Sequence, residues 1–346
     1  MIFENTWPGL LTELVRGRDL TAEQTAWAMN EILGGNVTPV QMAAFMVALR
    51  AKGETPDELS GLARVMTEKA TPIELSKEAV DVVGSGGDRA NTVNISTMAA
   101  LVTAAAGVPV VKHGNRAASS TSGTADCLEA LGVKIDVAPE DQARILNEAG
   151  IVFLFAPLYH PSLRFAAPAR RELGIQTSFN FLGPLTNPAR PAAQAIGVAD
   201  VRMAELMAAV LAHRGSRGLV FHGGDGLDEL TTTTTSQIWL IQDGEISNQV
   251  FDPTDLGIPT AQLVDLVGGD AKTNAEVVHR VFAGERGPVR DVVQLNAAAA
   301  LLAFDGVNLK LPLAAQLSPF YEQAGQAIDS GAAERLVKKW VDVSNS

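Results

Sequence analysis

The chain has 346 residues, of which 47% are hydrophobic and 19% charged, and its formal net charge is −12. This length and composition predict a globular protein with one large and one smaller domain, and they exclude a disordered chain. The negative charge argues against nucleic acid or an anionic membrane as a main partner, and the single cysteine, Cys127, excludes an internal disulfide and fits the reducing cytoplasm.

The first ~75 residues contain helix-start signals and no strand pattern. Thr21–Gln24, Thr38–Gln41 and Thr55–Glu58 each match a capping box, in which a hydroxyl and a Gln or Glu three residues later satisfy free backbone N–H groups. Two of these segments carry Pro at the first helical position, where no N–H is needed. The sequence therefore predicts a small all-helical N-terminal domain over residues 1–76.

From Ala79 onward, short β-branched runs alternate with Ala-rich helical runs, a pattern typical of α/β proteins. It predicts a large domain over residues 77–346 with a mainly parallel sheet flanked by helices. An edge hairpin turns around Asp243-Gly244, the stretch 274–341 reads as helical, and the helical stretch near 161–190 is expected to join the N-terminal domain. The expected parallel strands are Val80–Val83, Val108–Val111, Ile151–Phe155, Ala195–Val198 and Leu219–Phe221.

A glycine-rich loop, Gly84-Ser-Gly-Gly-Asp88, follows the first expected strand. Its glycines allow positive φ and close approach to a ligand, so that successive N–H groups can bind an anion. The loop lacks the Lys of a Walker motif and the third glycine of a dinucleotide fingerprint. A plain tight turn is the alternative interpretation.

Polar side chains then precede an expected Ala-rich helix, Met98–Ala106. A helix N-terminus carries partial positive charge and free N–H groups, which suit a phosphate. The alternative is that Ser96 or Thr97 only caps the helix, although both roles can coexist. The polar residues are Thr92, Asn94, Ser96 and Thr97.

A second loop, Lys112-His-Gly-Asn-Arg116, follows the second expected strand and offers an ammonium, an imidazole, an amide and a guanidinium in five residues. Ser119 and Ser120 add hydroxyls, and Thr124 lies at an expected helix start. This density indicates an anion site, with a solvated basic loop as the alternative.

These segments occur in the order and spacing seen in anthranilate phosphoribosyltransferases, which the chain resembles over nearly its whole length. Pyrimidine nucleoside phosphorylases share the architecture but resemble the chain less closely at Lys112. Two departures are visible: Ser85 stands where the family commonly has Thr, and Gln176 where many members have Arg. The resemblance continues through His160-Pro161, Arg170–Gly174, Phe179–Pro188 and Asp225–Leu230.

The resemblance implies an enzyme that transfers the phosphoribosyl group of 5-phosphoribosyl 1-pyrophosphate (PRPP) to the amine of anthranilate in tryptophan biosynthesis. It implies two Mg²⁺ ions, one held by Ser96 and the other by Asp228 and Glu229, in the oxygen-rich setting that magnesium prefers. An exposed acidic turn is the alternative for Asp228 and Glu229, but their position after a strand favours the metal. The implied PRPP-binding residues are Gly84, Gly87, Asp88, Thr92, Asn94, Ser96, Thr97, Lys112, Asn115, Ser119, Ser120 and Thr124.

For anthranilate, the resemblance implies that Arg170 binds the carboxylate, with Gly84 and Asn115 as further contacts and His113 and His160 along the access path. A guanidinium can meet a carboxylate with two hydrogen bonds. No residue is assigned as acid or base, because the arylamine is neutral at pH 7 and Lys112 can act electrostatically on the departing pyrophosphate.

Two other functions stay open at the level of the sequence. A nucleoside phosphorylase would share the fold, but Arg170 argues against it. A non-catalytic nucleic-acid-binding relative should be basic, whereas this chain is acidic. A homodimer through the N-terminal domain is also expected, and the alternative is that the same apolar residues only pack on the large domain. These residues are Met42, Phe45, Met46 and Leu49.

Overall fold

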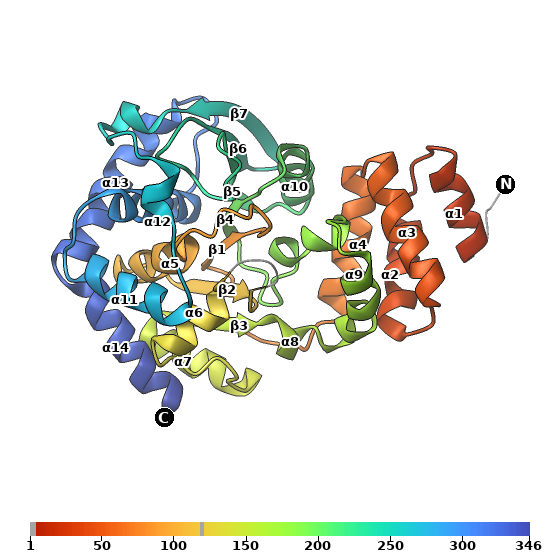
Figure 1. Ribbon diagram of the computed structural model, residues 1–346, viewed down its shortest axis with the longest axis horizontal. Coiled ribbons are helices and arrows are strands. Elements are labelled where there is room, and N and C mark those ends of the chain that lie inside the picture. Colours follow the sequence, from red (N-terminus) through yellow and green to blue (C-terminus); the bar gives the residue numbers. More distant parts are fainter. Residues whose placement is uncertain (1–4, 118–120) are drawn as a thin grey trace.

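The computed structural model describes residues 5–117 and 121–346, which form two lobes (Figure 1). In the smaller lobe, the hydroxyls of Thr21, Thr38 and Thr55 each accept the backbone N–H three residues on, so all three predicted capping boxes are confirmed. The all-helical N-terminal unit is confirmed as well, while its boundary at residue 76 stays a prediction. Its helices are α1 (Trp7–Val15), α2 (Ala22–Gly34), α3 (Pro39–Lys52) and α4 (Pro56–Glu68).

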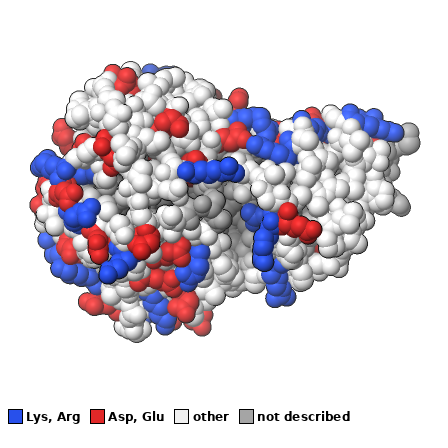
Figure 2. Space-filling model, in the orientation of Figure 1, with Lys and Arg blue, Asp and Glu red and all other residues white. Residues whose placement is uncertain are grey.

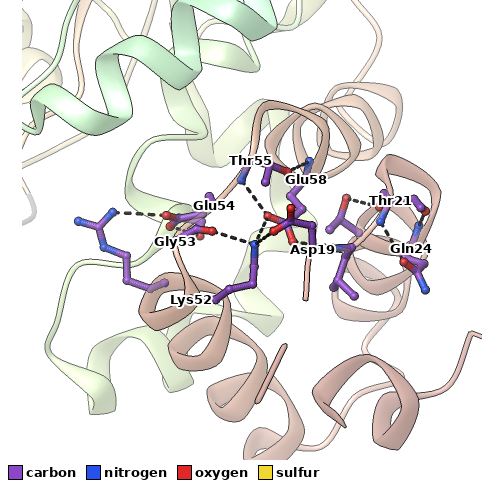
Figure 3. Close-up of polar contacts among 12 residues, drawn as sticks. Asp19, Thr21, Gln24, Lys52, Gly53, Glu54, Thr55 and Glu58 are labelled. Carbon is purple, nitrogen blue, oxygen red and sulfur yellow. Dashed lines mark hydrogen bonds and ion pairs between the residues drawn. The ribbon is translucent and has the colours of Figure 1, made fainter. Parts of the chain in front are cut away.

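A buried carboxylate, Glu58, joins the ends of these helices (Figure 3). Its Oε2 accepts from Lys52 Nζ at 2.9 Å and from the backbone N–H of Thr55 at 2.8 Å, and its Oε1 accepts from Leu20 N at 2.8 Å. Lys52 also contacts Asp19 at 2.7 Å. The buried charge of Glu58 is tolerated because both of its carboxylate oxygens accept hydrogen bonds. These contacts hold α2, α3 and α4 together at their ends.

The large lobe is built on a seven-stranded sheet in the order β3-β2-β1-β4-β5-β6-β7. The strands from β3 to β5 in this order are parallel, while β6 and β7 are antiparallel, so the mainly parallel sheet and its edge hairpin are confirmed. The strands are β1 (Val80–Gly84), β2 (Val110–Gly114), β3 (Ile151–Phe155), β4 (Ala193–Gly197), β5 (Arg217–Gly223), β6 (Ser236–Gln242) and β7 (Glu245–Phe251).

The second strand differs from the expected Val108–Val111 because it begins two residues later and continues through Gly114. Lys112 pairs with Phe153 and His113 with Leu154 in the parallel register with β3. Both side chains therefore stand on a strand and not in the loop that the sequence predicted. The polar residues Lys112 and His113 end the apolar run in the sequence, but pairing with β3 extends the strand through both of them.

Helices cover both faces of the sheet, as predicted. Alternate residues of β4 and β5 point to opposite faces: Ala195 and Leu219 join one hydrophobic core, and Ile196 and Val220 join the other. The longer helices of this lobe are α5 (Ile95–Ala105), α6 (Thr124–Ala130), α7 (Gln142–Ala149), α10 (Val201–His213), α11 (Ala271–Phe282), α12 (Pro288–Asp305), α13 (Leu313–Asp329) and α14 (Ala332–Asn345).

The core that contains α10 continues into the N-terminal helices, where α4 packs against α10. The segment after β3 also lies beside these helices (Figure 1), with α9 against α3. After α8 (Ala156–Tyr159), the stretch 161–173 is broken into a 3₁₀ turn (Pro161–Phe165) and α9 (Ala167–Leu173). Its assignment to the N-terminal domain stays a prediction. The expected dimer residues are all buried inside this core: Met42, Phe45, Met46 and Leu49.

A second buried carboxylate, Glu54, connects the two lobes. It lies between α3 and α4, accepts from Ser178 Oγ at 2.7 Å and pairs with Arg202 of α10. Arg50 of α3 pairs with Asp200 at 2.5 Å, next to this contact. The small lobe is therefore joined to the large one by charged contacts as well as by apolar packing. Within the described residues, no helix is long and apolar enough to cross a membrane.

Candidate functional site

The glycine loop after β1 and the acidic turn after β5 meet at the carboxyl edge of the sheet. The N–H of Gly86 donates to Asp228 Oδ2 at 2.6 Å. A Cβ on Gly84 would lie 2.3 Å from the same oxygen, and a Cβ on Gly197, at the end of the intervening strand β4, would lie 1.7 Å from the carbonyl oxygen of Asp228. The close approach of the two loops thus requires glycine at both strand ends. Sequence reasoning found Gly84 but missed Gly197.

Asp228 and Glu229 are 8% and 9% exposed, which rules out the exposed acidic turn. Burial, with the nearby Asp88, raises the pKa of Asp228 to about 7. Burial and Asp228 raise the pKa of Glu229 well above its usual range, against the backbone hydrogen bond from Ser96. The negative charge of these two adjacent carboxyls is therefore not fully compensated by the residues around them. A bound cation would supply the missing positive charge.

Lys112 of β2 supplies part of the positive charge that the acidic pair requires. Its side chain is 1% exposed, and Nζ donates to the carbonyl of Val82 and to Ser96 Oγ, at 3.3 Å for Ser96. Burial lowers the pKa of this amine to about 8, opposed by the carboxylates Asp81, Glu229 and Asp228. The amine is thus placed where its positive charge can act on the acidic pair, and its hydrogen bonds to Val82 and Ser96 fix its position.

A buried polar pair, which the sequence did not reveal, supports this lysine. Asp81 of β1 accepts from Asn187 Nδ2 at 2.8 Å and from the backbone N–H of His113 at 3.2 Å. Burial raises the pKa of Asp81 to about 6. The available signal in the sequence was Asp81 itself, a single charged residue inside an apolar strand. A buried strand tolerates such a residue only when the charge has hydrogen-bond partners.

Helix α5 begins at Ile95, three residues before the expected start at Met98. Asn94 therefore occupies the N-cap position, and Ser96 and Thr97 lie in the first turn, so the interpretation of Ser96 or Thr97 as the cap is wrong. The Asn94 side chain makes no cap hydrogen bond and contacts Ser122 and Asn274 instead. Without a side-chain cap, the N–H of Ser96 in this turn interacts with Glu229.

The other predicted residues of the glycine loop have local partners. Asp88 accepts from the N–H of Ala90 at 3.3 Å. Thr92 forms an isolated antiparallel bridge with Val267, a contact between distant segments that no local pattern predicts. Gly87 has φ +90°, and Gln176 Nε2 donates to its carbonyl oxygen at 3.3 Å.

The second loop is less basic than the sequence indicated. Arg116 pairs with Asp126 at 3.0 Å and with Glu129 at 2.5 Å, so it is not free for an anion. Asn115 is exposed, and Thr124 is the first residue of α6, as expected. The predicted residues Ser119 and Ser120 lie outside the described residues.

Arg170 projects from α9, on the other side of the site. Arg170 is half-buried, and desolvation lowers the pKa of its guanidinium, while among the described residues no carboxylate pairs with it. Neither Glu172 nor Glu205, the partners that a merely structural role would use, forms an ion pair with it. Gln176, six residues further on, reaches the glycine loop at Gly87. The segment that carries Arg170 is thus placed against the loop from the opposite lobe.

His113 and His160 form a buried pair with ring centroids 5.2 Å apart. His113 Nδ1 lies 3.2 Å from the carbonyl oxygen of Gly183, and His160 Nε2 lies 3.0 Å from that of Thr186. Burial lowers the pKa of His113 to about 3 and that of His160 to about 4, so both rings are neutral at pH 7. Their expected place along an access path stays a prediction.

The backbone that follows Glu229 is fixed by a residue that sequence reasoning missed, Asn296 of α12. Its Nδ2 donates to the carbonyl of Leu230 at 2.8 Å, and its Oδ1 accepts from Leu230 N at 3.0 Å. The signal was a lone amide within an otherwise apolar helix. No group of three His, Cys, Asp or Glu side chains in the described ranges could hold a metal alone. A metal here would need further oxygens, such as those of a phosphate.

The space-filling view shows a hollow between the lobes, with Lys and Arg side chains at its margins (Figure 2). The glycine loop, the buried acidic pair and Lys112 come from the large lobe, and Arg170 comes from the segment packed on the small one. This arrangement can bind a phosphorylated, metal-chelating molecule on one side and a carboxylate on the other.

Comparison with known proteins covers both lobes. Residues 8–70 match the helical bundle domain of a glycosyl transferase family, and residues 76–334 match its a/b domain. The anthranilate phosphoribosyltransferase of Arthrobacter sp. (strain FB24) is 58% identical over 97% of this chain and 96% of its own length. That of Thermobifida fusca (strain YX) is 55% identical over 99% of this chain and 98% of its own length.

Solved structures agree. Anthranilate phosphoribosyltransferase from Thermus thermophilus superposes with a TM-score of 0.89 at 39% identity, covering 97% of this chain and 99% of that one. The enzyme from Saccharomyces cerevisiae in complex with PRPP and Mg gives a TM-score of 0.88 and covers 99% of both chains, but at 24% identity it shows the fold alone.

Proposed function

This chain belongs to the anthranilate phosphoribosyltransferase family, and from that premise we propose which of its residues carry the reaction. The enzyme transfers the phosphoribosyl group of PRPP to the amine of anthranilate, giving N-(5-phosphoribosyl)anthranilate and pyrophosphate in tryptophan biosynthesis. Relatives more than half identical over almost the entire chain set aside a nucleoside phosphorylase or a nucleic-acid-binding protein.

The observation that carries the site assignment is the meeting of the glycine loop with the buried acidic pair. Backbone N–H groups of the loop and of the first turn of α5 cradle the phosphates, as helix N-termini do. The side chains proposed for PRPP are Asp88, Thr92, Asn94, Ser96, Thr97, Lys112, Asn115 and Thr124, together with the backbone of Gly84 and Gly87 and, by resemblance, Ser119 and Ser120.

The acidic pair fits a magnesium site. Asp228 and Glu229 are buried, adjacent and only partly compensated by Lys112, and Ser96 lies beside them with its N–H on Glu229. We infer that Ser96 holds one Mg²⁺ and the acidic pair a second, with phosphate oxygens completing each shell. When bound, Mg²⁺ neutralises negative charge on the pyrophosphate as that group leaves the ribose.

Lys112 adds a positive charge that does not need to be rearranged during the reaction. Its amine is held by the carbonyl of Val82 and by Ser96 Oγ, so it is oriented before the substrate arrives. Such a preorganised charge stabilises the transition state, in which the bond from ribose C1 to pyrophosphate breaks. The lone pair of the neutral anthranilate amine then bonds to C1, and the nitrogen afterwards loses one proton to water or to the departing pyrophosphate, so no strong base is needed before the attack.

Arg170 binds the carboxylate of anthranilate in this proposal. Its guanidinium is half-buried without a carboxylate partner among the described residues, which is expected of a charge that binds an anionic ligand. Asn115 and the backbone of Gly84, which belong to the large lobe, are proposed as further contacts to anthranilate, together with His113. Productive binding therefore needs both lobes, which places the amine near ribose C1.

We also propose a cytoplasmic homodimer that forms through the N-terminal helices. The residues first expected at the interface are buried within one chain, so the contact must use other side chains. Val40 and Val47 are 78% and 38% exposed on one face of α3, and Val15 of α1 is 79% exposed. Exposed apolar side chains on packed helices favour association of two copies.

The decisive experiment follows the fluorescence of anthranilate with the purified protein. Loss of anthranilate should occur only when PRPP and Mg²⁺ are both present, and pyrophosphate should appear in equal amount. Consumption of a nucleoside and phosphate, without use of anthranilate, would overturn the assignment.

A further inference from the structure

Asn274, on the first turn of α11, contacts Asn94 from a position 180 residues away in the sequence. It is 1% exposed. Its Nδ2 donates to Asn94 Oδ1 at 2.8 Å, and its Oδ1 accepts from the N–H of Gly269 at 2.8 Å. The segment that contains Gly269 lies along the residues between the glycine loop and α5, because Gly268 N donates to the carbonyl of Asn91 at 2.8 Å. Asn274 therefore joins this segment to the start of α5.

Backbone groups at both ends fix the direction of these hydrogen bonds. Gly269 N–H can only donate, so the oxygen of the Asn274 amide must face it and the nitrogen must face Asn94. Asn94 must then present its oxygen to Asn274, which turns its nitrogen to the carbonyl of Ser122 at 3.2 Å. One orientation of the Asn94 amide is thereby selected.

This orientation has two consequences for the site. First, Asn94 Oδ1 is occupied by Asn274 and by Ser122 Oγ at 3.3 Å, so it cannot cap α5 although Asn is among the strongest N-cap residues. The N–H groups of the first turn stay open to Glu229 and to a phosphate. Second, one N–H of the Asn94 amide has no acceptor within the described part of the chain and can donate to a substrate oxygen.

We propose that Asn274 is a positioning residue for PRPP: it holds the amide of Asn94 so that the nitrogen can donate to the substrate and the oxygen cannot cap α5. Asn274 itself does not touch the substrate. The inference rests on the assignment of Asn94 to PRPP binding made above.

The test replaces Asn274 by Asp, which has the same shape but only acceptor oxygens. Asp can still accept from Gly269 N–H, but it cannot donate to Asn94, whose amide must turn to give its nitrogen to the new carboxylate. We expect the KM for PRPP to rise roughly 10-fold or more, the loss typical of a hydrogen bond to a charged ligand. The KM for anthranilate at saturating PRPP should change little. Asn274→Ala, which removes the contact without adding charge, should give the same pattern.

The matched control is Asp270→Ala. Asp270 caps the same helix by accepting from Thr273 N at 2.8 Å, and it does not touch Asn94. This substitution should lower the melting temperature through the start of α11 and leave both KM values unchanged. If Asp270→Ala raised the KM for PRPP as much as Asn274→Asp, a general loosening of α11 would explain both effects, and the proposal would be overturned.

A double-mutant cycle with Asn94→Ala completes the test, with binding of PRPP and Mg²⁺ measured by isothermal titration calorimetry so that a folded but inactive variant is still informative. If Asn274 acts through Asn94, Asn274→Ala should weaken binding little further in the Asn94→Ala background. Equal, additive losses would refute it. If Asn94→Ala alone left binding unchanged, the assignment of Asn94 would fall, and this inference with it. A loss with Asn94→Ala but none with either Asn274 variant would refute this inference alone.

Discussion

Replacement of Arg170 by Ala separates the two substrates of the reaction. The guanidinium comes from the segment packed on the small lobe, whereas the glycine loop, Lys112 and the acidic pair come from the large one. A charged hydrogen bond contributes about 1.5–3 kcal/mol, so removing it should lower kcat/KM for anthranilate roughly 10- to 150-fold. The KM for PRPP should move little. Arg170→Lys should rescue only in part, because an ammonium lacks the planar fork of donors.

The burial of Arg170 adds a second readout. Burial lowers its pKa, and no carboxylate pairs with it within residues 5–117 and 121–346, so the free enzyme bears an uncompensated cost of desolvation. Arg170→Ala should therefore leave the melting temperature of the free enzyme unchanged or raise it, even as catalysis falls. A residue with a structural ion pair would show the opposite.

Steady-state kinetics with each substrate varied in turn, beside thermal unfolding, decides between these readings. The matched control is Arg171→Ala, because Arg171 is the exposed neighbour on the same helix and should affect neither KM. Equal losses for both substrates with Arg170→Ala would mean that this residue acts on the sugar phosphate or on the position of the lobes. The placement of the anthranilate site would then be wrong.

Three further predictions follow from the same structure. Asp228→Asn with Glu229→Gln should raise the Mg²⁺ concentration needed for activity, and an unchanged Mg²⁺ titration would refute the assignment. Burial raises the pKa of both carboxyls, to about 7 for Asp228, so their ionisation opposes folding and this variant should also melt higher than the wild type at pH 8. Burial lowers the pKa values of His113 and His160, so between pH 6.5 and about 4 these residues bind protons in the unfolded chain but not in the folded one, and the free energy of unfolding falls as the pH falls. In the variant with both histidines changed to Asn, urea unfolding should show this fall reduced by about 1.4 kcal/mol per pH unit for each histidine. Parallel pH profiles for the variant and the wild type would contradict this. Light scattering should give a dimer at micromolar concentration and a monomer for Val40→Glu with Val47→Glu, whereas a monomeric wild type would end the dimer proposal.

The sequence predicted the fold wherever local chemistry decides structure. The capping boxes at Thr21, Thr38 and Thr55 formed because each supplies its own hydrogen-bond partners within one turn. The parallel strands followed from runs of buried β-branched residues. The end of β2 was misplaced because Lys112 and His113 interrupt such a run, and only pairing with β3 and the buried Asp81 shows that they continue it.

The site divides in the same way. Gly84 and Asp228 could be singled out because both follow strands, and the topology brings the ends of parallel strands to one edge. Gly197 and Asn274 could not be singled out from the sequence, because their partners are distant in the chain: Gly197 packs against the carbonyl of Asp228, and Asn274 donates to the amide oxygen of Asn94. The basic character assigned to Arg116 was overestimated for a related reason: its partners on α6 face it only after that helix has packed.

The most direct test of the proposed site is the position of the metal. Mn²⁺ can replace Mg²⁺ in oxygen-rich sites and scatters anomalously, so a crystal grown with Mn²⁺ and PRPP locates the ion without assumptions about the substrate. We expect an anomalous peak within about 2.3 Å of the Asp228 or Glu229 carboxylate, or one bridging water away, and a second beside Ser96. Peaks elsewhere, with the acidic pair left without a cation while PRPP is bound, would contradict it.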